Sequence, residues 1–230
     1  MAAEYRHEHK YPVTAAQEAM LLPRLRTLMR PDIHAGPSGS YNIRSLYFDD
    51  CDDTCLRQNE DGTEPREKFR LRIYNGSAAL IQLELKRKEH GMTQKFACAV
   101  TEEQCRTLMA GRPLTAGQLA GAPSLLHRLA AAQRTRLLRP RVIVAYDRTP
   151  FVYPQGNVRV TLDKAIASSN AVSQFLQPRL PLRGVLPTGR LLLEVKYDEF
   201  LPDQIYRALQ LGRMQQTAFS KYYLCRTFHL

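Results

Sequence analysis

The sequence predicts an α+β fold in which a mostly antiparallel β-sheet closes into a tunnel with a basic lumen and helices packed on the outside. Short segments of alternating apolar and polar residues make up most of the chain, and period-two alternation is typical of β-strands. The polar faces of these segments are mainly basic. The chain carries 33 Lys and Arg against 22 Asp and Glu, a formal net charge of +11. Such an excess indicates an acidic partner.

The length of 230 residues is enough for one large domain, and no repeat or linker divides it, so we expect a single domain over 1–230. The hydrophobic fraction of 44% is typical of a globular protein. The five cysteines are scattered, which favours free thiols in a reducing compartment over a zinc site. No apolar leader and no apolar stretch of about 20 residues is visible. We therefore expect a cytoplasmic protein without a membrane segment, and the sequence leaves its oligomeric state open.

Local signals predict the order of the elements. Strands are predicted at 5–13, 41–48, 68–74, 80–88, 94–100, 141–148, 158–165 and 191–196. Two of them flank Asn75-Gly76, a turn pair that favours a hairpin. Thr14 with Gln17, and Thr101 with Gln104, have the spacing of capping boxes that begin helices. Further helices are predicted at 123–138 and 202–214, and 220–222 is expected to continue a helix.

Charged residues share one face of most predicted strands, because side chains of equal parity point the same way. The charged faces comprise Arg6, Glu8 and Lys10; Lys68, Arg70 and Arg72; Glu84, Lys86 and Lys88; Tyr146 and Arg148; Arg159 and Asp163; and Glu194 and Lys196. A half-exposed sheet with a solvated face is the commonest cause of such alternation. However, like charges on neighbouring strands repel unless an anion lies between them. Closure into a barrel gathers these residues in one lumen, where phosphate groups supply the missing negative charge.

At these residues the sequence resembles VTC domains, the polyphosphate polymerase domains that are related to CYTH proteins and other triphosphate tunnel metalloenzymes. The resemblance spans almost the whole chain and rests on seven motifs in order. They are Arg6-His-Glu8-His-Lys10-Tyr11, Arg44-Ser-Leu-Tyr-Phe-Asp49, Lys68-Phe-Arg70-Leu-Arg72-Ile-Tyr74, Glu84-Leu-Lys86, Tyr146-Asp-Arg148, Leu193-Glu194-Val-Lys196 and Ser220-Lys221-Tyr222. Arg6 stands where the CYTH pattern has its first Glu, which favours the VTC branch.

The resemblance implies an eight-stranded tunnel that binds ATP, polyphosphate or tripolyphosphate together with Mn²⁺ or Mg²⁺. Together with the charged faces, it predicts a set of catalytic residues: Arg70, Arg72, Lys86, Arg148 and Lys221. Substrate-binding roles are expected for Lys10, Lys68, Lys88, Lys95, Tyr146, Arg159, Lys196 and Ser220. Glu194 is the expected metal ligand, with Glu8 as a second.

Three functions remain open on the sequence. A polyphosphate polymerase would transfer the γ-phosphate of ATP to a growing chain, with the metal neutralising charge. A triphosphatase would use nearly the same tunnel with water as the acceptor, and a non-catalytic polyphosphate-binding module would need only the basic ring. A nucleic-acid binder is disfavoured because the chain has no Trp, and Tyr11 and Tyr47 resemble core or tunnel-mouth residues.

Other polar residues are assigned no role in the site. His7 and His9 alternate with Glu8 and should face away from the tunnel. The acidic run at 49–53 is expected to be a solvated loop, although it could hold a cation. The arginines on predicted helices are expected to be surface charge: Arg24, Arg26, Arg128, Arg134 and Arg136.

Overall fold

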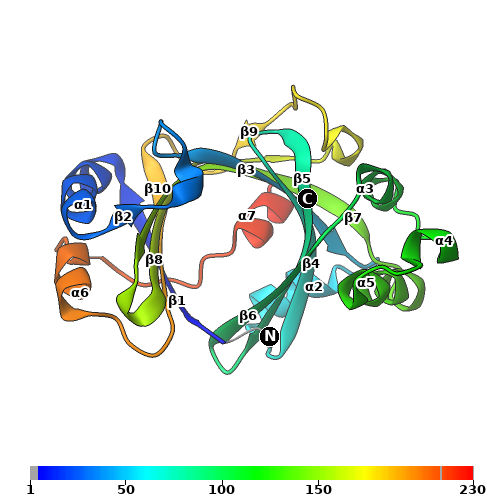
Figure 1. Cartoon of the computed structure of the whole chain (residues 1–230), viewed down its shortest axis with the longest axis horizontal. Helices are drawn as coiled ribbons and strands as arrows, with labels where there is room; N and C mark the ends of the chain where they lie inside the picture. Colours follow the sequence, from blue (N-terminus) through cyan, green and yellow to red (C-terminus); the bar gives the residue numbers. More distant parts are fainter. Residues whose placement is uncertain (1–4, 213, 230) are drawn as a thin grey trace.

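The computed structural model describes residues 5–212 and 214–229, and its strands form a single antiparallel sheet that curls around on itself (Figure 1). The strands are β1 (His7–Thr14), β2 (Arg30–Pro31), β3 (Tyr41–Asp49), β4 (Arg66–Tyr74), β5 (Ser77–Glu89), β6 (Met92–Ala99), β7 (Arg139–Tyr153), β8 (Val158–Ser169), β9 (Arg183–Gly184) and β10 (Arg190–Tyr197). The helices are α1 (Ala15–Leu28), α2 (Thr54–Glu60), α3 (Glu102–Met109), α4 (Ala116–Leu119), α5 (Ser124–Thr135), α6 (Asp203–Leu209) and α7 (Lys221–Thr227), with short 3₁₀ turns η1 (Ile33–Ala35), η2 (Gln155–Asn157) and η3 (Val172–Gln174).

Eight strands follow one another in the order β1-β10-β8-β7-β3-β4-β5-β6, and the short strands β2 and β9 pair with β7 and β8. The eight-stranded antiparallel sheet is therefore confirmed. The edge strands β1 and β6 meet where Arg6 and Thr93 exchange backbone hydrogen bonds of 2.9 and 3.0 Å. Within the described residues this is one bridge and not a continuous ladder, so the expectation of a fully closed tunnel was too strong. Alternation identifies the two faces of a strand, but it does not say which edge strands will pair.

Local signals account for most element boundaries. The β4–β5 hairpin turns at Asn75-Gly76, where both residues have positive φ, as a tight hairpin turn requires. Thr14 and Thr101 each complete the predicted capping box at the start of α1 and α3. The predicted helix at 123–138 ends earlier, at Thr135, and the helix predicted at 202–214 is only Asp203–Leu209. Residue 213 of that range lies outside the described residues.

The apolar outer faces of the strands lie under helices on two sides. On one side, α3 and α5 pack over β4 and β5, where Phe69, Leu71 and Leu83 are buried. On the other, α1 and α6 cover β8 and β10, including Val195. Figure 1 shows these groups at opposite ends of the molecule. This confirms that the apolar faces point outward. No helix within the described ranges is long and apolar enough to cross a bilayer.

Helix α7 differs from the expectation that helices pack on the outside, because it lies against the inner face of the sheet (Figure 1). Its residues Tyr222 and Cys225 are buried in one cluster with Val142 and Val144 of β7. At this end of the barrel, the inward-facing residues of β3 and β7 are apolar, and α7 removes them from water.

Candidate functional site

The inward faces of seven strands, together with α7, carry two sets of ion pairs, one around Glu84 and one around Glu8, Asp163 and Glu194. We call the two sets together the interior network. We define it by its members: the cations Lys10, Arg70, Arg72, Lys86, Lys95, Arg148, Lys196 and Lys221, and the acids Glu8, Glu84, Asp163 and Glu194. Eight basic side chains face four carboxylates, although burial lowers the pKa of Lys86 to about 7, so that this lysine is only partly charged at neutral pH. The predicted charged faces thus point inward. All five residues predicted to be catalytic belong to this network, and so do both predicted metal ligands.

One part of the network is centred on Glu84 of β5, whose side chain is completely buried. Arg70 donates to its Oε2 from Nε at 2.7 Å and lies directly opposite it in the β4–β5 ladder. Lys95 of β6 donates to Oε1 at 2.9 Å, and Arg72 lies 3.5 Å from Oε2. Arg70 also donates to the Tyr47 hydroxyl at 2.6 Å. Three cations therefore share one carboxylate, which leaves unused capacity for an anionic ligand.

A second part joins β7, β8 and β10 to α7. Arg148 donates to both Asp163 oxygens, at 2.6 and 2.7 Å, and to Glu194 at 3.2 Å. Lys221 lies 2.6 Å from both Asp163 and Glu194. It also lies 4.8 Å from the ring centre of Tyr146, a cation–π contact. The first residue of α7 is therefore held by carboxylates from two separate strands.

A third part links β1 to β5 and β10 through Glu8. Lys86 lies 2.5 Å and Lys196 3.1 Å from the Glu8 carboxylate, with Lys10 at 3.5 Å. Since β5 does not neighbour β1 in the sheet, the contact between Lys86 and Glu8 passes β6 on the inner side. Lys10 also donates to the carbonyl of Phe219 at 2.8 Å, which ties β1 to the segment before α7.

The protonation states of these groups follow from burial opposed by close charges. Burial disfavours ionisation of Glu194, but Lys221, Lys196 and Arg148 outweigh it and hold its pKa well below the usual range. The same balance lowers the pKa of Glu84 through Arg70 and Arg72, and that of Glu8 through Lys86 and Lys10. Glu8, Glu84 and Glu194 are therefore ionised at neutral pH.

The donor set fits a hard divalent cation that a phosphate ligand shares. Glu8 and Glu194 both contact the Lys196 ammonium, at 3.1 and 3.4 Å, so the two carboxylates border the position that this cation occupies. Carboxylate oxygens are the protein ligands that Mg²⁺ and Mn²⁺ prefer. No three His, Cys, Asp or Glu in the described part of the chain form a metal cage by themselves. Phosphate oxygens and water would therefore complete the coordination of such an ion, as is usual for Mg²⁺.

Five predicted substrate-binding residues are not members of the interior network, and four of them have partners outside it. Lys68 donates to Asn59 at 2.9 Å and lies over the Tyr222 ring, and burial lowers its pKa to about 8. Lys88 pairs with Glu64 at 3.0 Å, and Arg159 pairs with Asp32 at 2.9 Å. The Ser220 hydroxyl accepts a hydrogen bond from the Tyr223 amide, which caps α7.

Tyr146, also predicted to bind substrate, borders the network. It is buried, and its hydroxyl lies 3.4 Å from Nη2 of Arg72. Its ring stacks beneath Arg148 as well as Lys221. Its position between the Arg72 and Arg148 parts of the network is consistent with the predicted role.

Sequence reasoning assigned no role to Glu84, Asp163 or Tyr47, although each contacts a predicted cation. Their inward parity was the available signal, but alternation alone does not separate a counter-ion from a ligand. The expected solvated loop at 49–53 was wrong for its first two residues. Asp49 and Asp50 are buried. Asp49 accepts hydrogen bonds from the backbone amides of Cys55 and Leu56 and from the Tyr222 hydroxyl.

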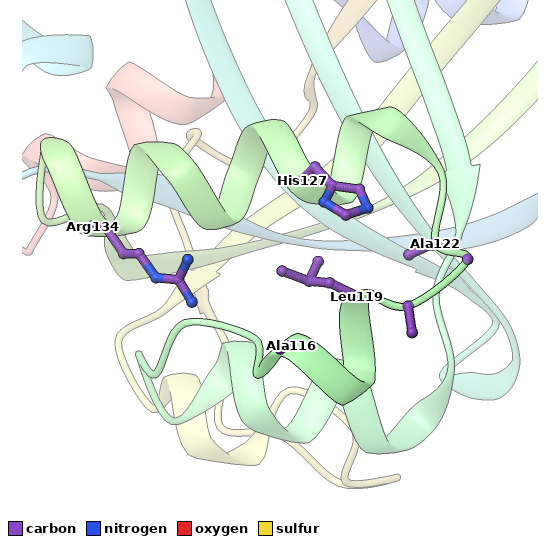
Figure 2. A pocket seen from close by; sticks show the side chains of 7 residues that line it. Ala116, Leu119, Ala122, His127 and Arg134 are labelled. Carbon is purple, nitrogen blue, oxygen red and sulfur yellow. The ribbon is translucent and has the colours of Figure 1, made fainter.

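The residues assigned no role in the site are otherwise placed as predicted. His7 and His9 contact Tyr197 instead of the network. A shallow cleft between α4 and α5, shown in Figure 2, lies outside the barrel and is lined by His127 and Arg134 but by no member of the network. Arg134 is exposed and donates to the carbonyl of Leu114, so it serves as a surface control for the interior arginines.

The solved structure of a plant protein agrees with this architecture. The putative adenylyl cyclase from Hippeastrum, described as having a dominant triphosphatase activity, is 11% identical with a TM-score of 0.56, over 98% of this chain and 96% of that chain. A putative adenylate cyclase from Bacillus halodurans is 14% identical with a TM-score of 0.49, over 90% of this chain and 87% of that one. No curated protein matches the sequence.

A family model gives a more direct assignment. The model of the VTC domain matches residues 5–228, which include every strand and every member of the interior network. This match agrees with the order of motifs in the sequence and with the eight-stranded sheet. The chain therefore belongs to the VTC domain family.

Proposed function

We propose that this protein is a metal-dependent polyphosphate polymerase, which transfers the γ-phosphate of ATP to the end of a growing polyphosphate chain. The observation that carries the proposal is the interior network, in which eight cations share four carboxylates on the inner face of the sheet. This excess of basic side chains over carboxylates suits a polyanion such as a triphosphate. Membership of the VTC family supports the same substrate class.

Binding would proceed by exchange of ion pairs. Without ligand, the carboxylates of Glu84, Asp163 and Glu194 neutralise the nearest Arg and Lys side chains. Phosphate oxygens offer the same cations an equivalent anionic partner, and Arg forks match them with two parallel hydrogen bonds. Arg70, Arg72 and Arg148 would therefore orient the phosphates, while the lysines would add point charges.

The proposed transfer breaks the bond between the γ-phosphorus of ATP and its bridging oxygen, and forms a bond to a terminal oxygen of the polyphosphate chain. ADP leaves with the electron pair of the broken bond, and the chain gains one phosphate. A divalent ion held by Glu194 and Glu8 would supply charge neutralisation at the phosphates. The basic side chains would hold donor and acceptor in line, which is most of what phosphoryl transfer asks of a protein.

A triphosphatase is the second candidate. The specific observation in its favour is the similarity of fold to the Hippeastrum protein, for which a dominant triphosphatase activity is described. The same network would bind the triphosphate, but water would accept the phosphoryl group. The two functions differ in product, so product analysis separates them.

The test is to incubate the purified protein with ATP and Mn²⁺, and to measure ADP, free phosphate and polyphosphate resolved on a gel. We expect ADP together with a polyphosphate ladder. If free phosphate forms in a one-to-one ratio with ADP and no polyphosphate ladder appears, the protein is a triphosphatase and not a polymerase. Binding of polyphosphate without consumption of ATP or tripolyphosphate would leave a non-catalytic binding module. Preference for ATP and polyphosphate over nucleic acid, and a cytoplasmic location, stay predictions.

A further inference from the structure

The hydroxyl group of Thr161 is buried on the inner face of the sheet without a hydrogen-bond partner among the described residues. The residue is 1% exposed, and its Oγ1 atom forms no hydrogen bond within the part of the chain that the structure describes. Buried hydroxyls in proteins are nearly always paired, because an unpaired one keeps the full penalty of its lost hydration. Two inner-face hydroxyls are paired, since Tyr47 contacts Arg70 and Ser45 contacts Arg72, whereas the hydroxyl of Thr93 on β6 also has no partner among the described residues.

The position of Thr161 places this hydroxyl beside the candidate metal and phosphate site. Along β8, its neighbours on the inner face are Arg159 and Asp163. Across the ladders it lies opposite Glu194 of β10 and Pro150 of β7. Residues opposite each other in a sheet have Cβ atoms about 5 Å apart. Glu194 nevertheless directs its carboxylate to Lys221, Arg148 and Lys196, and Pro150 has no polar side-chain atom.

A valine at this position would have the same shape and no unpaired hydroxyl, so packing alone does not explain a threonine. We propose that Thr161 is a positioning residue whose hydroxyl donates a hydrogen bond to an oxygen brought in by the bound phosphate chain. The oxygen belongs either to a phosphate or to a water molecule on the accompanying cation. The inference rests on the proposed function, because it needs a phosphate ligand in the barrel. As Arg148 and Lys221 move from carboxylates to phosphates, the compartment beside Thr161 becomes accessible to this oxygen.

The experiment compares the wild type with Thr161→Val and Thr161→Ser, and uses Thr149→Val as the matched control. Thr149 lies on the neighbouring strand β7, opposite Leu162 on the outer face, so it does not face the ligand. Tripolyphosphate affinity is measured by titration calorimetry in EDTA and again with Mn²⁺, and stability by urea unfolding without ligand. Thr161→Val should be at least as stable as the wild type while it binds tripolyphosphate about tenfold more weakly, about 1.4 kcal/mol. Thr161→Ser and Thr149→Val should bind within twofold of the wild type.

The two buffers identify the source of the oxygen. A loss of affinity in both buffers assigns the contact to a phosphate, and a loss only with Mn²⁺ assigns it to the shell of the cation. The inference is overturned if the tripolyphosphate affinity of Thr161→Val is within twofold of the wild type in both buffers. It is also overturned if Thr161→Ser binds tripolyphosphate as weakly as Thr161→Val. A wild-type protein that does not bind tripolyphosphate would overturn the proposed function as well, so the two failures are distinguishable.

Discussion

Glu84 is the best position at which to test whether the interior network is built for an added anion. Its side chain is completely buried and contacts Arg70 at 2.6 Å, Lys95 at 2.9 Å and Arg72 at 3.5 Å. Glu84→Gln keeps the size of the side chain and most hydrogen-bonding capacity, but removes the negative charge. The positive charge of the network then rises by one. The ligand-free protein should become less stable, and tripolyphosphate should bind more tightly.

The loss of stability expected for Glu84→Gln follows from the environment of the ion pairs around Glu84. Removing one partner of a buried ion pair costs about 3–5 kcal/mol, because the remaining charge is left uncompensated. The lower figure applies here, since glutamine still accepts hydrogen bonds and Lys95 is half exposed. With a slope of about 3 kcal/mol per molar urea, a loss of about 3 kcal/mol lowers the unfolding midpoint by about 1 M. A folded protein with a typical stability of 5–15 kcal/mol survives this change.

The assay is urea unfolding at pH 7, with and without tripolyphosphate. At 100 times its dissociation constant, a ligand stabilises the folded state by about 2.7 kcal/mol, and each tenfold gain in affinity adds about 1.4 kcal/mol. Because Glu84→Gln should bind tripolyphosphate more tightly than the wild type does, the ligand should reduce the difference in unfolding midpoint between the two proteins. Glu102→Gln is the matched control, since its pair with Arg106 is exposed and contributes little.

Two results would refute this reasoning. If Glu84→Gln is as stable as Glu102→Gln without ligand, the interior charges are screened by water and the network is not a buried one. If the difference in unfolding midpoint between Glu84→Gln and the wild type is unchanged or larger when tripolyphosphate is added, the phosphate chain does not contact the cations around Glu84.

The remaining predictions concern binding, turnover and pH. Arg70→Ala and Arg72→Ala should each weaken tripolyphosphate binding at least about tenfold in calorimetry, because each removes a charge-assisted contact. Arg134→Ala, on the surface, should not weaken it. Equal effects of all three substitutions would indicate diffuse electrostatics instead of a site. Glu194→Gln should lower Mn²⁺-dependent ATP consumption by about 100-fold or more per folded molecule, while tripolyphosphate still binds. If this variant retains turnover, Glu194 is only a counter-ion. The pKa of Glu194 is depressed in the folded state, so its contribution to stability is present above the ordinary glutamate value of about 4.3 and is lost as pH falls through the folded pKa. Urea unfolding between pH 6 and pH 3 should show this loss, and it should be smaller in Glu194→Gln.

Much of the fold was predictable because its signals are local. The parity of Arg70 and Arg72 against Leu71 identifies the two faces of β4 without any knowledge of its neighbours. The Asn75-Gly76 turn and the capping box at Thr14 act within a few residues of themselves, and both are present. The order of motifs identified the family, which in turn indicated eight strands.

The candidate site was predictable as a set of residues but not as a set of partners. The sequence indicated that Lys86, Arg148 and Lys221 face a common lumen, since each belongs to a basic face or a family motif. It did not indicate that Asp163 and Glu194 hold Lys221, because these residues are far apart in the chain and meet only when α7 docks.

The sequence by itself determined which side chains point inward, where the hairpin turns and the capped helices begin, and that the interior carries excess positive charge. Only the tertiary structure decided that α7 lies inside the barrel, that Asp49 is buried beneath Tyr222, and that β1 meets β6 at one bridge. The physical reason is the range of the interactions. Side-chain alternation and helix capping depend on neighbours in the chain, whereas burial and charge pairing depend on which distant segments fill the same space.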